Sequence, residues 1–223
     1  MQCGGKFQVS SFQFQVLNRP MTNESVDERL RLFVAITVPG AIREEMLRVQ
    51  RELQPLAPRG VIRWAKPEQF HLTLRFLGDV ASNRVTDLQE SVRTACASTP
   101  VLPLRALGVG FFPHARSPRV IWAGVNDDEN RLAELQKKIE DAVRPFTTER
   151  GNEHFAGHVT LGRFKQFKWL EIMELTASAE VLKDRAFGEW TTQEIDLIRS
   201  ELSPTGARHS KFAAFQLGQI SSP

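Results

Sequence analysis

The sequence predicts an α+β fold of two pseudo-symmetric lobes, each an antiparallel sheet with helices on its outer face, and an active-site cleft between the sheets. Two observations predict this fold. Strand-like and helix-like apolar segments follow one another in an order that is used twice along the chain. A His-x-Thr-Leu tetrad also occurs twice, at 71–74 and 158–161, so the copies start 87 residues apart (158 minus 71), one in each half.

Composition and charge narrow the class of protein. With 223 residues, 41% hydrophobic and 25% charged, the chain has the length and balance of a globular domain with a sizeable core. A net charge of +3 and a pI near 9.1 favour anionic partners. No apolar run of about 18 residues is present, so no membrane span is predicted.

Cysteine usage predicts the compartment. Cys3 and Cys96 are far apart and form no Cys-x-x-Cys pair. This argues against a disulfide framework or a structural zinc cluster and favours a reducing cytoplasm.

The chain divides into a polar leader and one large domain. Residues 1–28 contain Gly4-Gly5 and Asn18-Arg19-Pro20 and are predicted to be a flexible N-terminal extension, with translation from Met21 as an alternative. The alternating Phe12, Phe14 and Val16 would instead fit a strand. Residues 29–220 are predicted to form a single bilobal domain.

Apolar periodicity predicts the elements of this domain in order. An apolar run bounded by Pro or Gly predicts a strand, and apolar residues three and four apart predict a helix. The first half gives strand 32–38, helix 42–53, strands 61–64 and 70–77, and helix 85–95. The second half gives strands 102–109 and 119–125, helix 132–143, strand 157–164, helix 169–179, and strands 191–200 and 210–217.

The tetrads are the candidate catalytic residues. In a strand, side chains alternate between the two faces, so histidine and threonine share one face while the two aliphatic residues anchor the other. A single histidine in a strand is more often structural. Core packing, however, gives no reason to place His and Thr together on one face twice.

Two facing histidines suit phosphoester cleavage without a metal. An imidazole with a pKa of about 6.5 can take a proton from the attacking group when neutral, and give one to the leaving oxygen when protonated. Hydroxyls of Thr73 and Thr160 could donate hydrogen bonds to the non-bridging phosphate oxygens. No cofactor or metal is expected.

The tetrads and their flanks resemble the 2H phosphoesterase superfamily, and within it the bacterial and archaeal RNA 2′,3′-cyclic phosphodiesterases, also described as 2′-5′ RNA ligases. The resemblance rests on the tetrads together with Arg63-Trp64, Arg75-Phe76-Leu77-Gly78, Gly162-Arg163-Phe164 and a late segment at 200–207. It covers roughly residues 30–217, with His209 standing where a tyrosine is expected.

This resemblance implies hydrolysis of RNA 2′,3′-cyclic phosphate ends to 2′-phosphomonoesters. His71 would be the proton donor and His158 the proton acceptor, although a pseudo-twofold site could exchange these roles. The resemblance also implies that Thr73, Thr160 and Arg163 bind the substrate. RNA ends or small cyclic nucleotides would be the ligands, and a monomer is expected.

Strand parity complicates the arginines. It places Arg75 on the face of His71, as a solvated strand-end charge, and Arg163 on the face opposite His158, unless a twist or bulge occurs near Gly162. Trp64 could stack on a base or be a core aromatic.

Three rival interpretations remain open. His154 and His158 are four apart, as in helical zinc pairs, but Gly157 and a strand-like run disfavour this. Cys96 could be a nucleophile, though its helix predicts a buried thiol. A non-catalytic RNA-end or nucleotide-binding module, or an RNA ligase, would carry the same residues.

Overall fold

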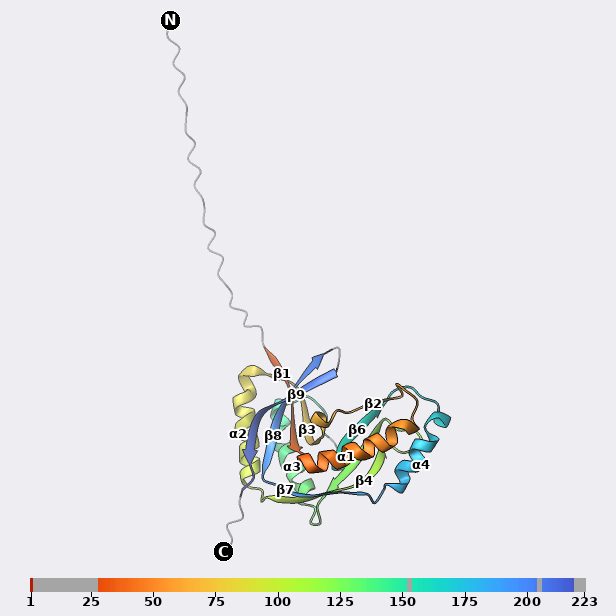
Figure 1. The fold of residues 1–223 in the computed structure, drawn as a ribbon. Helices are drawn as coiled ribbons and strands as arrows, with labels where there is room; N and C mark the ends of the chain where they lie inside the picture. The colour runs from red at the N-terminus through yellow and green to blue at the C-terminus, as the bar shows by residue number, and fades with distance from the viewer. Residues whose placement is uncertain (2–27, 152–153, 204–205, 219–223) are drawn as a thin grey trace.

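The computed structural model describes residues 1, 28–151, 154–203 and 206–218. It contains one antiparallel sheet in the order β7-β4-β5-β6-β3-β1-β8-β9, with β2 paired to β6 (Figure 1). The strands are β1 (Arg29–Thr37), β2 (Ile62–Trp64), β3 (His71–Ala81), β4 (Leu102–Phe112), β5 (Val120–Asn126), β6 (His158–Phe164), β7 (Ala186–Thr192), β8 (Glu194–Ser203) and β9 (Gly206–Gln216). The helices are α1 (Gly40–Leu53), α2 (Val85–Ala97), α3 (Arg131–Val143) and α4 (Met173–Val181).

The sheet consists of two halves that meet at the tetrad strands. The first half is β3, β1, β8 and β9, and the second is β6, β5, β4 and β7 with β2. β3 and β6 join them through the pair Leu72 and Val159. The predicted α+β class with two halves is confirmed. The sheets are continuous through this pair rather than separate, which brings the two tetrads onto neighbouring strands.

Two helices are exchanged between the halves. α2 packs on β8 and β9 of the first half, and α4 packs on β4 of the second. α1 follows β1 of the first half but packs on β7 and α4 of the second (Figure 1). α3 follows β5 of the second half but packs on β3 and α2 of the first. Each half of the sheet is therefore covered partly by a helix that follows, in the chain, a strand of the other half.

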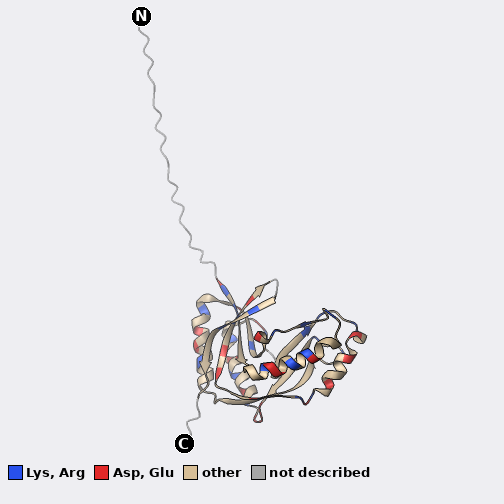
Figure 2. Cartoon of the chain, viewed as in Figure 1, with Lys and Arg blue, Asp and Glu red and all other residues tan. Residues whose placement is uncertain are grey.

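The core lies between the sheet and these helices. The positions that predicted the helices are the ones that are buried: Ile42, Met46, Val49 and Leu53 on α1, and Leu132, Leu135, Ile139 and Val143 on α3. Burial of such a stripe supplies most of the stability of an amphipathic helix. Charged residues are interspersed along the helices (Figure 2), and none of those on α1 is buried. In the described part of the chain, no helix is long and apolar enough to cross a membrane.

One strand was missed. The sequence predicted a single strand over 191–200, whereas the structure has β7 followed by β8. β7 is an edge strand in which only Phe187 and Thr192 are buried and Gly188 has a φ of +134°. It therefore lacks the alternation that identifies a half-buried strand. Of the predicted N-terminal extension, residues 2–27 lie outside the described residues.

Candidate active site

The two tetrads lie side by side on antiparallel strands. The pairing of Leu72 with Val159 places each tetrad histidine across from the threonine of the other tetrad. We call the side of the sheet that carries these four polar residues the histidine face. The aliphatic members of the tetrads are buried toward the helices: Leu72, Leu74, Val159 and Leu161.

A one-residue bulge interrupts β6 after the second tetrad threonine. Against β5, Thr160 pairs with Trp122, but Gly162 pairs with Ile121, so Leu161 is the extra residue. A bulge of this kind reverses the parity of every residue that follows it. The bulge that the sequence analysis required near Gly162 is therefore present.

This bulge brings Arg163 onto the histidine face. Gly162 points to the core, where an added Cβ would lie 2.7 Å from Cγ2 of Ile62, so a side chain at this position would not fit. Arg163 lies close enough to both histidines that its charge lowers the pKa of His71 and of His158. The structure thus brings His71, His158 and Arg163 together.

The same bulge occurs in β3. Against β1, Thr73 pairs with Ala35 but Arg75 pairs with Val34, so Leu74 is the extra residue. Arg75 consequently turns to the helix side of the sheet instead of the histidine face.

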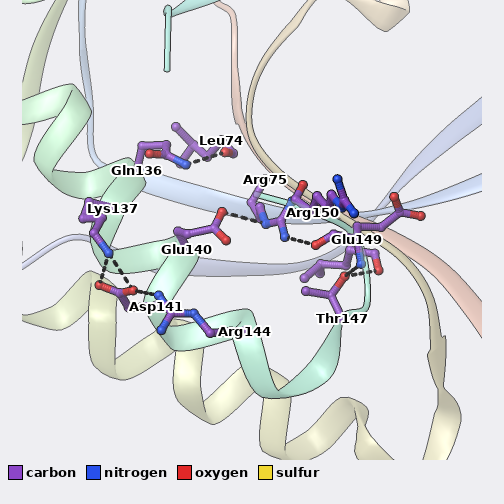
Figure 3. A network of polar contacts seen from close by, with 11 residues as sticks. Leu74, Arg75, Gln136, Lys137, Glu140, Asp141, Arg144, Thr147, Glu149 and Arg150 are labelled. Carbon is purple, nitrogen blue, oxygen red and sulfur yellow. Dashed lines mark hydrogen bonds and ion pairs between the residues drawn. The ribbon is translucent and has the colours of Figure 1, made fainter. Parts of the chain in front are cut away.

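Arg75 is therefore a buried structural cation, and the prediction of a solvated strand-end charge is wrong. Its side chain is only 7% exposed, and its Nε lies 2.7 Å from Oε2 of Glu140 on α3. Its other nitrogens donate to the backbone oxygens of Arg150 at 2.8 Å and Glu149 at 2.5 Å. Figure 3 shows the arginine joining β3 to α3 and to this loop, which precedes β6 in the chain.

His71 is enclosed by rings from β1, the neighbouring strand, and from β9, three strands away. Its ring centroid lies 4.8 Å from that of Phe33 on β1 and 5.3 Å from that of His209 on β9. Burial lowers the pKa of His71 to about 4, the positive charge of His209 and then of Arg163 and His158 acts in the same direction, and a hydrogen bond with the Gln69 backbone opposes them. His71 is thus mostly neutral at pH 7 when no anion is bound.

His158 is held in one tautomer. Its Nδ1 lies 2.8 Å from the backbone oxygen of Ala156, and since a carbonyl only accepts, Nδ1 must donate. The neutral ring then carries its lone pair on Nε2. Burial lowers the pKa of His158, and Arg163 lowers it further, while the Ala156 hydrogen bond opposes them. These are the properties of a general base.

Aromatic residues also line the second half beside His158. The ring of Phe112 meets His158 edge to face at 4.9 Å and lies 5.1 Å from Trp122. The Trp122 indole extends over two glycines, because a Cβ on Gly110 would lie 2.3 Å from its Cζ2 and one on Gly124 would lie 3.3 Å from its Cζ3. The sequence alone does not predict these aromatic residues at the site, since only the strand register brings them to His158.

The sheet curls toward the histidine face. Three strand steps separate β3 from β9, which in a flat sheet would put them about 14 Å apart. The rings of His71 and His209 are nevertheless 5.3 Å apart, and Nε2 of Gln69 donates to the backbone oxygen of Ala207 at 2.8 Å. The histidine face is therefore concave. His209 was not predicted to lie at the site, since 138 residues separate it from His71 (209 minus 71).

The remaining sequence candidates lie elsewhere. Trp64 packs on the core side of β2, with its Cε3 3.1 Å from the position of a Cβ on Gly162, which fits the core interpretation. Cys96 is buried, and burial raises the pKa of its thiol to about 12, so it is no nucleophile. Among the residues that the structure describes, no three His, Cys, Asp or Glu side chains are grouped to hold a metal ion.

Solved structures share this fold. A protein of Thermus thermophilus superposes with a TM-score of 0.69 at 24% identity, covering 86% of this chain and all of that one. E. coli LigT complexed with 3′-AMP superposes with a TM-score of 0.65 at 22% identity, with the same coverage.

Comparison with known sequences identifies the family. Residues 36–122 match the family model described as LigT like Phosphoesterase. A relative from Thermus thermophilus, named RNA 2′,3′-cyclic phosphodiesterase, is 32% identical over 197 residues, covering 84% of this chain and 90% of the relative. A relative of the same name from Methanocaldococcus jannaschii is 30% identical over 177 residues, covering 79% and 95%. Identity at this level over most of both chains shows that the protein belongs to the LigT-like phosphoesterase family of the 2H superfamily.

Proposed function

We propose that the protein hydrolyses RNA 2′,3′-cyclic phosphodiester ends to 2′-phosphomonoesters by two-histidine acid–base catalysis, without a metal. The observation that carries the proposal is the antiparallel register of the tetrads, which sets two histidine–threonine pairs against each other on one concave face. The name of the Thermus thermophilus and Methanocaldococcus jannaschii relatives supports it.

His158 is the base and His71 the acid in this mechanism. His158 Nε2, left unprotonated by the Nδ1 hydrogen bond, takes a proton from water as the water oxygen attacks phosphorus. The bond between phosphorus and O3′ breaks, and His71 gives its proton to O3′. The phosphate stays on O2′, and each histidine ends in the protonation state from which the other began.

Binding of the substrate allows His71 to take up, from solvent, the proton that it must donate. With a pKa of about 4, the free His71 ring is mostly neutral at neutral pH. A phosphate anion beside the ring favours the imidazolium form and raises the pKa. His71 is therefore protonated, as an acid must be, mainly when a phosphate is bound.

Three further side chains would bind the phosphate. The hydroxyls of Thr73 and Thr160 lie on the face of the histidines and can donate to non-bridging oxygens. Arg163 offers guanidinium N–H groups and acts on both histidines through its charge. We propose RNA ends or small cyclic nucleotides as ligands, a monomeric protein, and a cytoplasmic location that suits a sequence with two cysteines and no Cys-x-x-Cys pair.

Product analysis tests this function. A short RNA with a defined 2′,3′-cyclic phosphate end is incubated with the protein, with and without a strong chelator, and the product is resolved as 2′- or 3′-phosphate. We expect a 2′-phosphomonoester in both cases. A 3′-phosphate, inhibition by the chelator, or binding without turnover would contradict the proposal. Joining of tRNA halves would indicate ligation instead.

A further inference from the structure

Two arginines stand directly opposite each other at the edge of the site. Arg63 on β2 is the cross-strand partner of Arg163 on β6. Directly opposed residues in an antiparallel pair point to the same side of the sheet, with Cβ atoms about 5 Å apart. Since Trp64 packs on the core side with Gly162, Arg63 must share the histidine face with Arg163.

Neither arginine has an acidic partner in the described part of the chain. The ion pairs of the described residues include neither Arg63 nor Arg163. Burial, and then the charge of Arg63, lower the pKa of Arg163. Like charges directly opposite destabilise a sheet. The chain does neutralise Arg75 with a carboxylate and two carbonyls, so an unneutralised pair at the site is suited to an external anion.

The position of Arg63 indicates which anion. Arg163 acts on both tetrad histidines and so lies near the cyclic phosphate. Arg63 lies as far along β6 from the tetrads as Arg163 does, but on the neighbouring strand β2, which pairs with β6 at 162–164. Two guanidinium groups that face each other can hold two successive phosphates of one strand. With Arg163 at the reacting phosphate, Arg63 suits the neighbouring phosphate.

We propose that Arg63 binds the phosphodiester that precedes the terminal nucleotide, so that the enzyme prefers an RNA end to a mononucleotide. This inference rests on the proposed function. It assigns the scissile phosphate to the tetrads and Arg163, and the next phosphate to Arg63. The substrate class is then a polynucleotide with a cyclic end.

Two substrates and three variants test it. Adenosine 2′,3′-cyclic phosphate has only the reacting phosphate, whereas ApA with a 2′,3′-cyclic end has the preceding phosphodiester as well. We expect wild-type kcat/KM to be higher for the dinucleotide than for the mononucleotide. Arg63→Gln should lower kcat/KM for the dinucleotide roughly tenfold, the usual effect of losing one hydrogen-bonded charge contact. Turnover of the mononucleotide should be unchanged by Arg63→Gln.

Arg59→Gln is the matched control. Arg59 is exposed in the turn before β2 and does not face Arg163. Its substitution therefore removes the same charge as Arg63→Gln without removing the proposed phosphate contact. We expect it to leave both substrates unaffected, and Arg63→Lys to keep part of the dinucleotide preference. Rising salt should weaken the preference in wild type and not in Arg63→Gln.

The outcomes separate this inference from the proposed function. An equal loss on both substrates would place Arg63 at the scissile phosphate and overturn the inference, and so would no loss on either. A wild type that turns over neither substrate would overturn the proposed function itself. Arg63→Gln should melt no lower than wild type, since it relieves repulsion, so a fall in activity cannot be ascribed to unfolding.

Discussion

The two halves of the sheet share a backbone design and differ in the residues that follow it. In both, a tetrad is followed by a one-residue bulge, so the fourth residue after the histidine turns to the core and the fifth returns to the histidine face. The fourth residues are Arg75 and Gly162, and the fifth are Phe76 and Arg163. A repeated backbone thus supplies two equivalent histidines, while only the second half adds a cation beside them.

The rest of the histidine face follows the same division. On the first half, Asp196 of β8 is fully buried, 2.7 Å from Nζ of Lys211, and accepts a hydrogen bond of 2.6 Å from Thr37. On the second half, Trp122 extends over glycines. One half therefore carries a paired polar network, and the other an aromatic surface on which Arg63 and Arg163 face no carboxylate of the described residues. With the proposed function, this difference would give a bound nucleotide a direction.

Replacing either histidine tests whether the halves are equally needed, and should have the largest effect. We expect His71→Ala and His158→Ala each to slow turnover by roughly 10²–10⁴-fold, the contribution of one positioned acid or base. The measurement is the single-turnover rate on RNA with a cyclic phosphate end, with circular dichroism as the check on folding. Wild-type activity in either variant would end the two-histidine mechanism.

The next prediction tests the buried role of Arg75, which stands where the other half has Gly162. Arg75→Met leaves Glu140 without its partner, and should lower the free energy of unfolding by about 3 kcal/mol. Urea denaturation measures this. Arg144→Met, which removes an exposed ion pair with Asp141, is the control and should cost less than about 0.5 kcal/mol. If Arg75→Met proved as mild as the control, the buried role of Arg75 would be refuted.

The contrast at the fifth position should have a smaller effect, on activity. Arg163→Gln should lower kcat/KM by roughly 30-fold, equivalent to about 2 kcal/mol for a hydrogen-bonded charge contact. Phe76→Leu, at the equivalent position of the first half, should change it little. Steady-state kinetics on one cyclic-phosphate substrate compares them. Equal losses would show that the halves are chemically alike.

The smallest effect concerns pH. The positive charge of His209 lowers the pKa of His71, so His209→Phe should raise that pKa. His71 must be protonated to act as the acid, so the limb of kcat/KM that falls with rising pH should move to higher pH in this variant. A pH profile of kcat/KM measures the shift. A limb that stays in place, or moves down, would show that His209 does not act on His71.

Much of this arrangement was predictable because it depends on local pattern. The tetrads alternate with apolar residues, and the helices carry their apolar residues at helical spacing, so their elements and buried faces follow from the sequence. Gly162 also gave a local sign of the bulge, since only a residue without a side chain fits there.

The misplaced residues depend on strand pairing, which local pattern does not encode. Nothing in Leu74-Arg75 signals a bulge, because the extra residue is defined only against β1. His209 reaches the site through the curl of the sheet. Strand alternation therefore assigns side chains to the correct face of the sheet within a tetrad, but not after the bulge that follows it.

The exchange of α1 and α3 makes the duplicated halves inseparable. A fragment that ends after α2 would contain β1 and β3 without the helix that covers β3, and would expose the apolar stripe of α1 that belongs on β7. Neither this fragment nor the remainder of the chain could bury its own apolar residues. We therefore expect the protein to unfold in a single transition. Since the histidines come from strands on either side of this crossing, the pair of rings should be lost together with the fold rather than one at a time.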